Sequence, residues 1–84
     1  MVDEPLLILK VIEKTRKLYK EMDKYIIIKI SQEEGTDNKG FEFMGMFEEG
    51  IKSIESTQNL TTLNQVMRAL LNDDYILNFE YEIY

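Results

Sequence analysis

The stretch Tyr25-Ile26-Ile27-Ile28-Lys29-Ile30 decides the fold of this chain. Its β-branched side chains follow one another, which is costly in a helix because rotation about χ1 is restricted there. The same residues suit a strand, where branched side chains pack well on a pleated surface. We therefore expect a central or near-central strand that is covered on much of both faces.

The chain after this stretch predicts a second strand that runs back beside the first. Residues 33–40 are polar with a glycine near each end, which is typical of a reversing loop. The loop is too short to hold a helix and its connections, so the next strand should be antiparallel. Alternation in that strand places Phe41, Phe43 and Phe47 on one face and Glu42, Met44 and Met46 on the other.

Residues 47–57 allow two structures. A short helix that begins near Phe47 is compatible with the spacing of Phe43, Met46, Phe47, Ile51 and Ile54. Glu48, Glu49 and Gly50 can instead close the strand, so that another strand begins at Ile51. Propensity does not choose between them.

The chain before the central stretch predicts an amphipathic helix over about residues 4–23. Apolar residues recur there at intervals of three and four, and lysines occupy the opposite side. The apolar stripe consists of Ile8, Val11, Ile12, Thr15, Leu18, Tyr19 and Met22.

The C-terminal third predicts a helix and then a strand. Leu63, Val66 and Leu70 share a helical stripe, and Thr61 or Thr62 is expected to cap it, since Gln65 stands three residues after Thr62. Residues 75–84 alternate between apolar and polar, which is typical of a half-buried antiparallel strand. In this strand we expect Tyr75 and Tyr81 to fill the core, and Tyr84 to be exposed.

Together these segments predict one small α+β domain that spans residues 1–84. We expect an antiparallel sheet of three or four strands with two or three helices packed on one face. The predicted order is helix, strand, strand, a helix or strand, helix, strand. A chain of this size has a thin core, so self-association or a bound partner would be a natural supplement to its stability.

The amino-acid composition excludes most of the common types of catalytic site. The chain has no Cys and no His, which excludes thiolate zinc sites and every nucleophile that depends on a Ser-His or Cys-His pair. Its carboxylates lack the alternating spacing of a calcium loop. We expect no enzyme activity, no cofactor and no metal. The acidic start and the absence of a run of about 20 apolar residues favour a cytoplasmic protein with no membrane segment.

Charge is divided along the chain. Through Ser31, seven Lys and Arg residues face five acids, whereas from Gln32 onward eleven acids face three bases. The lysines of the first helix are interleaved with acids, which is typical of a solvated face, so we do not expect direct binding to nucleic acid. The acidic remainder suggests a basic partner.

The leading hypothesis is a non-catalytic protein that binds another protein through its acidic surface. An array of carboxylates can stand in for phosphates and occupy the basic site of a nucleic-acid-binding protein. In size, acidity and lack of catalytic groups the chain resembles the small acidic inhibitors of phages and other mobile elements, such as anti-CRISPR proteins and other DNA mimics, although no motif carries the resemblance. The expected contact acids are Glu33, Glu34, Asp37, Glu42, Glu48 and Glu49.

The alternative hypothesis is a self-associating structural or accessory subunit. An apolar sheet face would suit a homodimer, with Met44, Met46 and Tyr84 at the contact. Two acidic groups, residues 33–55 and residues 73–82, leave one question open: whether they share a face.

Overall fold

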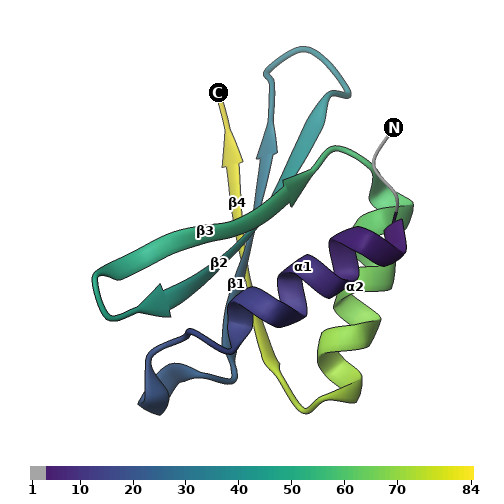
Figure 1. Cartoon of the computed structure of the whole chain (residues 1–84). Coiled ribbons are helices and arrows are strands. Elements are labelled where there is room, and N and C mark those ends of the chain that lie inside the picture. Colours follow the sequence, from purple (N-terminus) through teal and green to yellow (C-terminus); the bar gives the residue numbers. More distant parts are fainter. Residues whose placement is uncertain (1–3) are drawn as a thin grey trace.

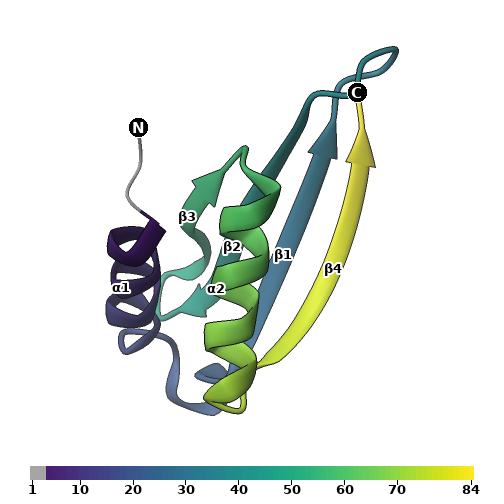
Figure 2. The same ribbon diagram turned by 90° about the vertical axis from the view of Figure 1, so that its right-hand side faces the viewer.

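The Ile-rich stretch forms one of the two inner strands of a four-stranded sheet in the computed structural model, which describes residues 4–84. Both helices pack on one face of this sheet (Figures 1 and 2). Within the described residues, the elements in chain order are α1 (Glu4–Thr15), the short 3-10 helix η1 (Lys20–Met22), β1 (Tyr25–Gln32), β2 (Lys39–Phe47), β3 (Gly50–Thr57), α2 (Leu60–Asn72) and β4 (Ile76–Ile83). The α+β fold, with its helices on one face, is confirmed.

The strands lie in the order β3-β2-β1-β4. β1 and β2 are antiparallel, as the short loop predicts, with Ile28 opposite Phe43 and Ile26 opposite Gly45. β1 is flanked by a strand on each side, which confirms its near-central position. It is covered on one face rather than on both, since Ile26 and Ile28 are buried under the helices while Ile27 points to the other side and is partly exposed.

Residues 47–57 contain the end of β2, a turn at Glu48-Glu49 and the strand β3 (Gly50–Thr57), so the helical alternative is wrong. Gly50 has φ +122°, a backbone conformation that favours glycine, and it lets the chain reverse directly after Glu48-Glu49. The register shifts between Phe43 and Met44, which leaves Ile54 as the extra residue of a β-bulge. The bulge points Ile54 into the core, where it is 2% exposed.

The first helix is shorter than the periodicity predicts. α1 ends at Thr15, whose hydroxyl donates to the carbonyl of Ile12 at 2.7 Å, and the backbone N–H of Tyr19 donates to the carbonyl of Met46 at 2.7 Å. This second bond ties the chain to β2 and ends the helical path. Leu18 is still buried, because its side chain lies over Gly45 from the connecting segment.

α2 is capped two or three residues earlier than expected. The side chain of Asn59 accepts from the backbone N–H of Thr62 at 3.0 Å, so Asn59 is the cap rather than Thr61 or Thr62. Thr62 is itself buried. The helix then presents Leu63, Val66 and Leu70 to the core, as the stripe predicts.

β4 differs most from its prediction, because it is parallel to β1 and the sheet is therefore mixed. The reason lies in the connection: α2 carries the chain back to the end where β3 began, so β4 runs in the same direction as β3. β3 and β1 share that direction, since each is antiparallel to β2.

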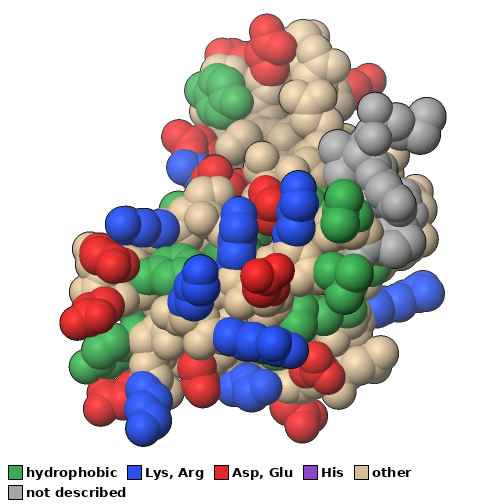
Figure 3. All heavy atoms as spheres, in the orientation of Figure 1, with side chains coloured by type: hydrophobic (Ala, Val, Ile, Leu, Met, Phe, Trp, Pro, Cys, Tyr) green, Lys and Arg blue, Asp and Glu red, His purple; other side chains and the backbone are tan. Residues whose placement is uncertain are grey.

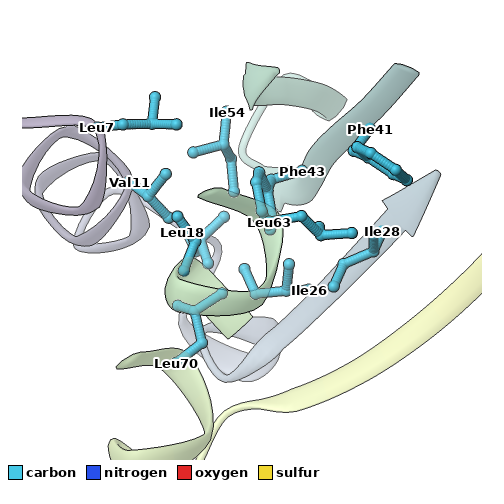
Figure 4. Packing of buried hydrophobic residues seen from close by; sticks show 11 residues of the cluster. Leu7, Val11, Leu18, Ile26, Ile28, Phe41, Phe43, Ile54, Leu63 and Leu70 are labelled. Carbon is cyan, nitrogen blue, oxygen red and sulfur yellow. The ribbon is translucent and has the colours of Figure 1, made fainter. Parts of the chain in front are cut away.

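The core lies between the two helices and the covered face of β1, β2 and β3 (Figure 4). Both helices and the Leu18 segment contribute to one cluster of buried side chains. Its members are Leu7, Val11, Leu18, Ile26, Ile28, Phe41, Phe43, Ile54, Leu63, Val66 and Leu70. β4 contributes little to this cluster, although Tyr75 and Leu77 at its beginning pack against it.

Candidate functional site

The face of the sheet opposite the helices is a mixed apolar and acidic surface. The register places Ile27 beside Met44 and Asn78 on this open face, and Met46 beside Ile51. Within the described chain, both α-helices lie on the other face (Figure 2). The methionines expected to form a contact surface are therefore on the open face, half-buried between their neighbours.

One end of the open face is an apolar hollow of about 380 Å³. Its apolar lining is Met22 from η1, Tyr25 and Ile27 from β1, Met46 from β2 and Ile51 from β3, and Asn78, Phe79 and Glu80 of β4 border it. Ile51 is 52% exposed despite its size. A hollow of this kind can receive an apolar side chain from a binding partner.

The other end of the open face is acidic. Lys29 lies opposite Glu42 on one side and Glu80 on the other, and its Nζ is 3.1 Å from an oxygen of Glu82. The hydrogen bond to Glu82, together with the negative charges of Glu82, Glu42 and Glu80, raises the pKa of Lys29 above its ordinary value of 10.5. Lys29 is thus cationic at neutral pH, and three carboxylates around one ammonium leave a net negative surface, which we call the acidic patch (Glu42, Glu80 and Glu82).

The loop acids lie beyond the same end of the sheet. Glu33, Glu34 and Asp37 are exposed in the connection between β1 and β2. The backbone N–H of Glu34 donates to the carbonyl of Tyr84 at 2.6 Å, so the last residue is held beside this loop. Tyr84 is 69% exposed, as expected, and together with Glu33 and Asp37 it lines a polar hollow of about 500 Å³.

Glu48 and Glu49 do not join this group. They lie in the turn between β2 and β3, at the opposite end of β2 (Figure 1). Glu49 is 3.9 Å from the Nζ of Lys52. The predicted acids therefore form no single array: the loop acids lie at one end of the sheet and Glu48-Glu49 at the other.

The later acidic group is also divided. Asp73 and Asp74 follow α2, and Asp74 adopts a positive φ of 64° in that turn. Glu80 and Glu82 lie in the acidic patch with Glu42. Acids of β2 and β4, which belong to the two separate acidic groups of the sequence, thus lie together on the open face. The acids in the turns at residues 48–49 and 73–74 lie elsewhere.

Basic side chains gather on the helix side of the molecule, over α1 and the segment after it (Figure 3). Lys14 is an exception to the solvated pattern, because its Nζ donates to the carbonyl of Ile54 at 2.9 Å and lies 3.4 Å from Glu55. Lys24 lies over the ring of Tyr75, 4.3 Å from its centroid, and donates to the carbonyl of Asp73 at 3.1 Å. These two lysines thus have structural contacts.

Sequence reasoning missed β4 as a surface element. Alternation places Leu77, Phe79, Tyr81 and Ile83 on the helix side of the sheet, in register with Ile26, Ile28 and Ile30 of β1. Phe79 and Tyr81 are each 56% exposed and Ile83 is 59% exposed, so the prediction of a half-buried strand with Tyr81 in the core is wrong. The alternation was visible, but it did not reveal that the helices stop short of this strand.

An open apolar hollow of about 530 Å³ lies between β4 and the beginning of α2. Its apolar lining is Leu60 and Leu63 of α2, Ile30 of β1, Phe41 of β2 and Tyr81 of β4. Leu60 is 59% exposed. On the face of the sheet against which the helices pack, β4 is therefore left uncovered.

No protein-family model, curated protein or solved structure matches this chain. No helix within residues 4–84 combines the length and the apolar character that crossing a bilayer requires. In the same part of the chain, no three acidic side chains come together in a way that could hold a metal ion.

Proposed function

We propose that this chain is a non-catalytic protein that binds another protein through the open face of its sheet. The observation that carries the proposal is the composition of that face: an apolar hollow at one end and the acidic patch at the other. Protein interfaces combine an apolar anchor with a polar rim, and charged groups in the rim guide association.

The partner surface that fits this face has an apolar side chain for the hollow beside Met46 and Ile51, and Lys or Arg side chains opposite the acidic patch. Glu80 is an exposed carboxylate, and Glu42 is half-exposed. The exposed loop acids Glu33, Glu34 and Asp37 extend the negative charge beyond the patch. With a net charge of −6, the whole chain favours approach to a basic protein.

In its specific form, the proposal is an inhibitor that occupies a basic nucleic-acid-binding site of its target. Carboxylates at fixed positions on a sheet can mimic the spacing of phosphates, and strands hold them more rigidly than a loop does. The acidity and size of the chain suit an inhibitor carried by a phage or another mobile element. The proposed site of action is the cytoplasm, where such targets meet nucleic acid.

Two double variants with equal charge change test the proposal. Glu42→Gln with Glu80→Gln neutralises part of the acidic patch, and Glu48→Gln with Glu49→Gln neutralises the distant turn. The first pair should weaken binding to the captured target by at least about tenfold, whereas the second should change it by less than about threefold. The readout is the dissociation constant from calorimetry at several salt concentrations.

The target itself is obtained by affinity capture and identified by mass spectrometry. We expect a nucleic-acid-binding protein whose DNA or RNA competes with this chain for the same site. Binding should weaken steeply as salt rises, because exposed charges are screened over about 10 Å at 0.1 M salt. Salt-independent binding, or equal effects of the two double variants, would contradict the proposal.

A further inference from the structure

The outer edge of β4 carries backbone groups that no other strand of the described chain pairs. The sheet order ends at β4. The N–H groups of Ile76 and Tyr84 donate to carbonyls of Lys24 and Gln32 beside β1, at 2.7 and 3.0 Å. Because backbone direction alternates along a strand, the N–H and C=O groups of the intervening odd-numbered residues point outward. These residues are Leu77, Phe79, Tyr81 and Ile83.

Apart from the charges of Glu80 and Glu82, this edge lacks the usual features that prevent strands of two molecules from pairing. Natural edges are protected by Lys, Pro, bulges or a covering element. Residues 76–83 contain no Lys, Arg, Pro or Gly, and their register with β1 runs without a shift from Ile76 to Ile83. Eight residues of regular strand are about 26 Å of available edge.

The side chains beside this edge are apolar and exposed. Phe79 and Tyr81 are each 56% exposed, which for side chains that bury about 150–250 Å² corresponds to roughly 200 Å² of apolar surface together. A specific interface takes about 800 Å² from each partner. Ile76, Ile83, Tyr84 and Leu60, all more than half exposed, and the edge backbone move the total toward that value.

We propose that β4 is a homodimer interface, in which two copies pair their β4 strands antiparallel about a two-fold axis and form one continuous eight-stranded sheet. An interface of this symmetry must be complementary to itself. Centred on Phe79, the pairing places Phe79 opposite Phe79, Leu77 opposite Tyr81 and Tyr75 opposite Ile83 of the second copy. Aromatic and aliphatic cross-strand pairs of this kind stabilise sheets.

Charge selects this register. When the axis lies at Phe79, Glu80 faces Asn78 of the second copy and Glu82 faces Ile76, so no acid lies directly opposite an acid. When the axis lies at Glu80, the two copies of Glu80 are directly opposite, which is destabilising. The pairing centred on Phe79 therefore keeps the full overlap of the strands without that repulsion.

The dimer also buries the exposed aromatic side chains of β4, Phe79 and Tyr81. The two-fold axis puts both pairs of helices on the same side of the joined sheet, so the two α2 helices flank the seam and the rows of Phe79 and Tyr81 fill the space between them. On the open face the two acidic patches meet across the seam. That last consequence bears on the proposed function, but the dimer itself does not depend on it.

Dissociation of the full-length chain is measured by analytical ultracentrifugation over a range of concentrations. Phe79→Lys places two ammonium groups at the axis and should raise the dimer dissociation constant at least about tenfold. The control is Ile51→Lys, which makes the same kind of change on the open face at a residue of similar exposure and should leave the constant within about twofold. Circular dichroism establishes that both variants are folded.

Cross-linking tests the register independently, because the natural chain has no Cys. Directly opposite residues lie about 5.5 Å apart between Cα atoms, within the range of a disulfide. Under mild oxidation Phe79→Cys should give a disulfide-linked dimer, and Glu80→Cys should give much less, since its symmetry mate is diagonal to it. Efficient linking at Glu80 instead would overturn the register.

Two further results would overturn the dimer: a monomer at millimolar concentration with no cross-linking at either position, or a greater loss of dimer from Ile51→Lys than from Phe79→Lys. Salt separates this proposal from the binding of a basic target. Added salt should strengthen the dimer, because it screens the carboxylates that meet across the seam, whereas it should weaken target binding. Each proposal can thus fail without the other.

Discussion

The two edge strands of this sheet are alike in length and differ in almost everything else. β3 lies under α1, contains a bulge, and has the carbonyl of its bulged residue Ile54 bonded by Lys14. β4 is regular, beyond the reach of the helices over most of its length, and lined by exposed aromatic residues. One edge is interrupted by a bulge and by the bond from Lys14, and the other is regular and open.

The difference shows how the two helices of a small domain cover some strands of its sheet and leave another exposed. Two helices packed side by side are about 20 Å wide, which is comparable with four strands about 4.8 Å apart, so the position of the pair decides which strand stays uncovered. In this chain they lie over β3, β2 and β1, so β4 receives cover only at Tyr75 and Leu77. An open edge is a recurrent site for strand addition by a partner.

A matched pair of isoleucines gives the largest expected contrast between the two edges. Ile54→Ala on β3 should lower the free energy of unfolding by about 2–5 kcal/mol, because the residue is 2% exposed and its loss leaves a cavity. Ile83→Ala on β4, at 59% exposure, should cost less than about 0.5 kcal/mol in the monomer. Urea unfolding at low protein concentration measures both.

If Ile54→Ala proves too unstable to purify, Ile54→Val replaces it, with an expected cost of about 0.5–1.5 kcal/mol. Equal costs at Ile54 and Ile83 would show that β4 is as well covered as β3, contrary to the comparison.

The covered side of the sheet should be intolerant of added volume at Gly45. A Cβ there would clash with a methyl carbon of Leu18 and lie 3.1 Å from one of Ile54. Gly45→Ala should therefore cost about 1–3 kcal/mol through overpacking. Gly40→Ala in the same strand is the control, since nothing lies within 4 Å of the added atom. A neutral result at Gly45 would mean that Leu18 does not hold its position over β2.

Removal of the lysine that caps the β3 bulge should have a smaller effect. Lys14→Met keeps the aliphatic part of the side chain and removes the hydrogen bond to the carbonyl of Ile54, with an expected cost of about 0.5–1.5 kcal/mol. Lys10→Met, an exposed lysine on the same helix, is the matched control. Thermal unfolding of both variants measures the difference. Identical midpoints would mean that the hydrogen bond from Lys14 does not stabilise the β3 edge.

The smallest expected effect concerns the ion pair that joins β1 to the open edge strand. The pKa of Lys29 is raised by Glu82, so the stabilisation from this pair is present below pH 10.5 and is lost as pH rises through the folded-state pKa. The difference in melting temperature between the natural chain and Glu82→Gln should therefore be constant from pH 8 to 10 and shrink above pH 10.5. A difference in melting temperature that grows above pH 10.5 would contradict the ion pair between Lys29 and Glu82.

Much of the candidate surface could be predicted residue by residue. The alternation of residues 41–47 correctly places Glu42, Met44 and Met46 on the face opposite Phe41 and Phe43. The exposure of Tyr84 also follows from its position in the pattern. Such assignments succeed because side chains alternate between the faces of any strand, whatever its neighbours are.

The grouping of the acids could not be predicted in the same way. Glu42 and Glu80 are far apart in the sequence and meet because β1 lies between β2 and β4, with Lys29 paired to both. Glu48 and Glu49 are close to Glu42 in the sequence and yet lie at the other end of β2. Strand order decides these distances, and strand order depends on contacts between distant segments.

By itself, the sequence determined the type of the elements that have a clear hydrophobic period or a run of branched side chains, because both signals act over a few residues, but it left residues 47–57 open between helix and strand. Residues 25–30 had to be a strand, and residues 63–70 had to be a helix with one apolar face. The tertiary structure decided where α1 stops, that α2 returns the chain to make β4 parallel, and that β4 is an open edge. These features depend on which strands the two helices pack against, and no local pattern contains that information.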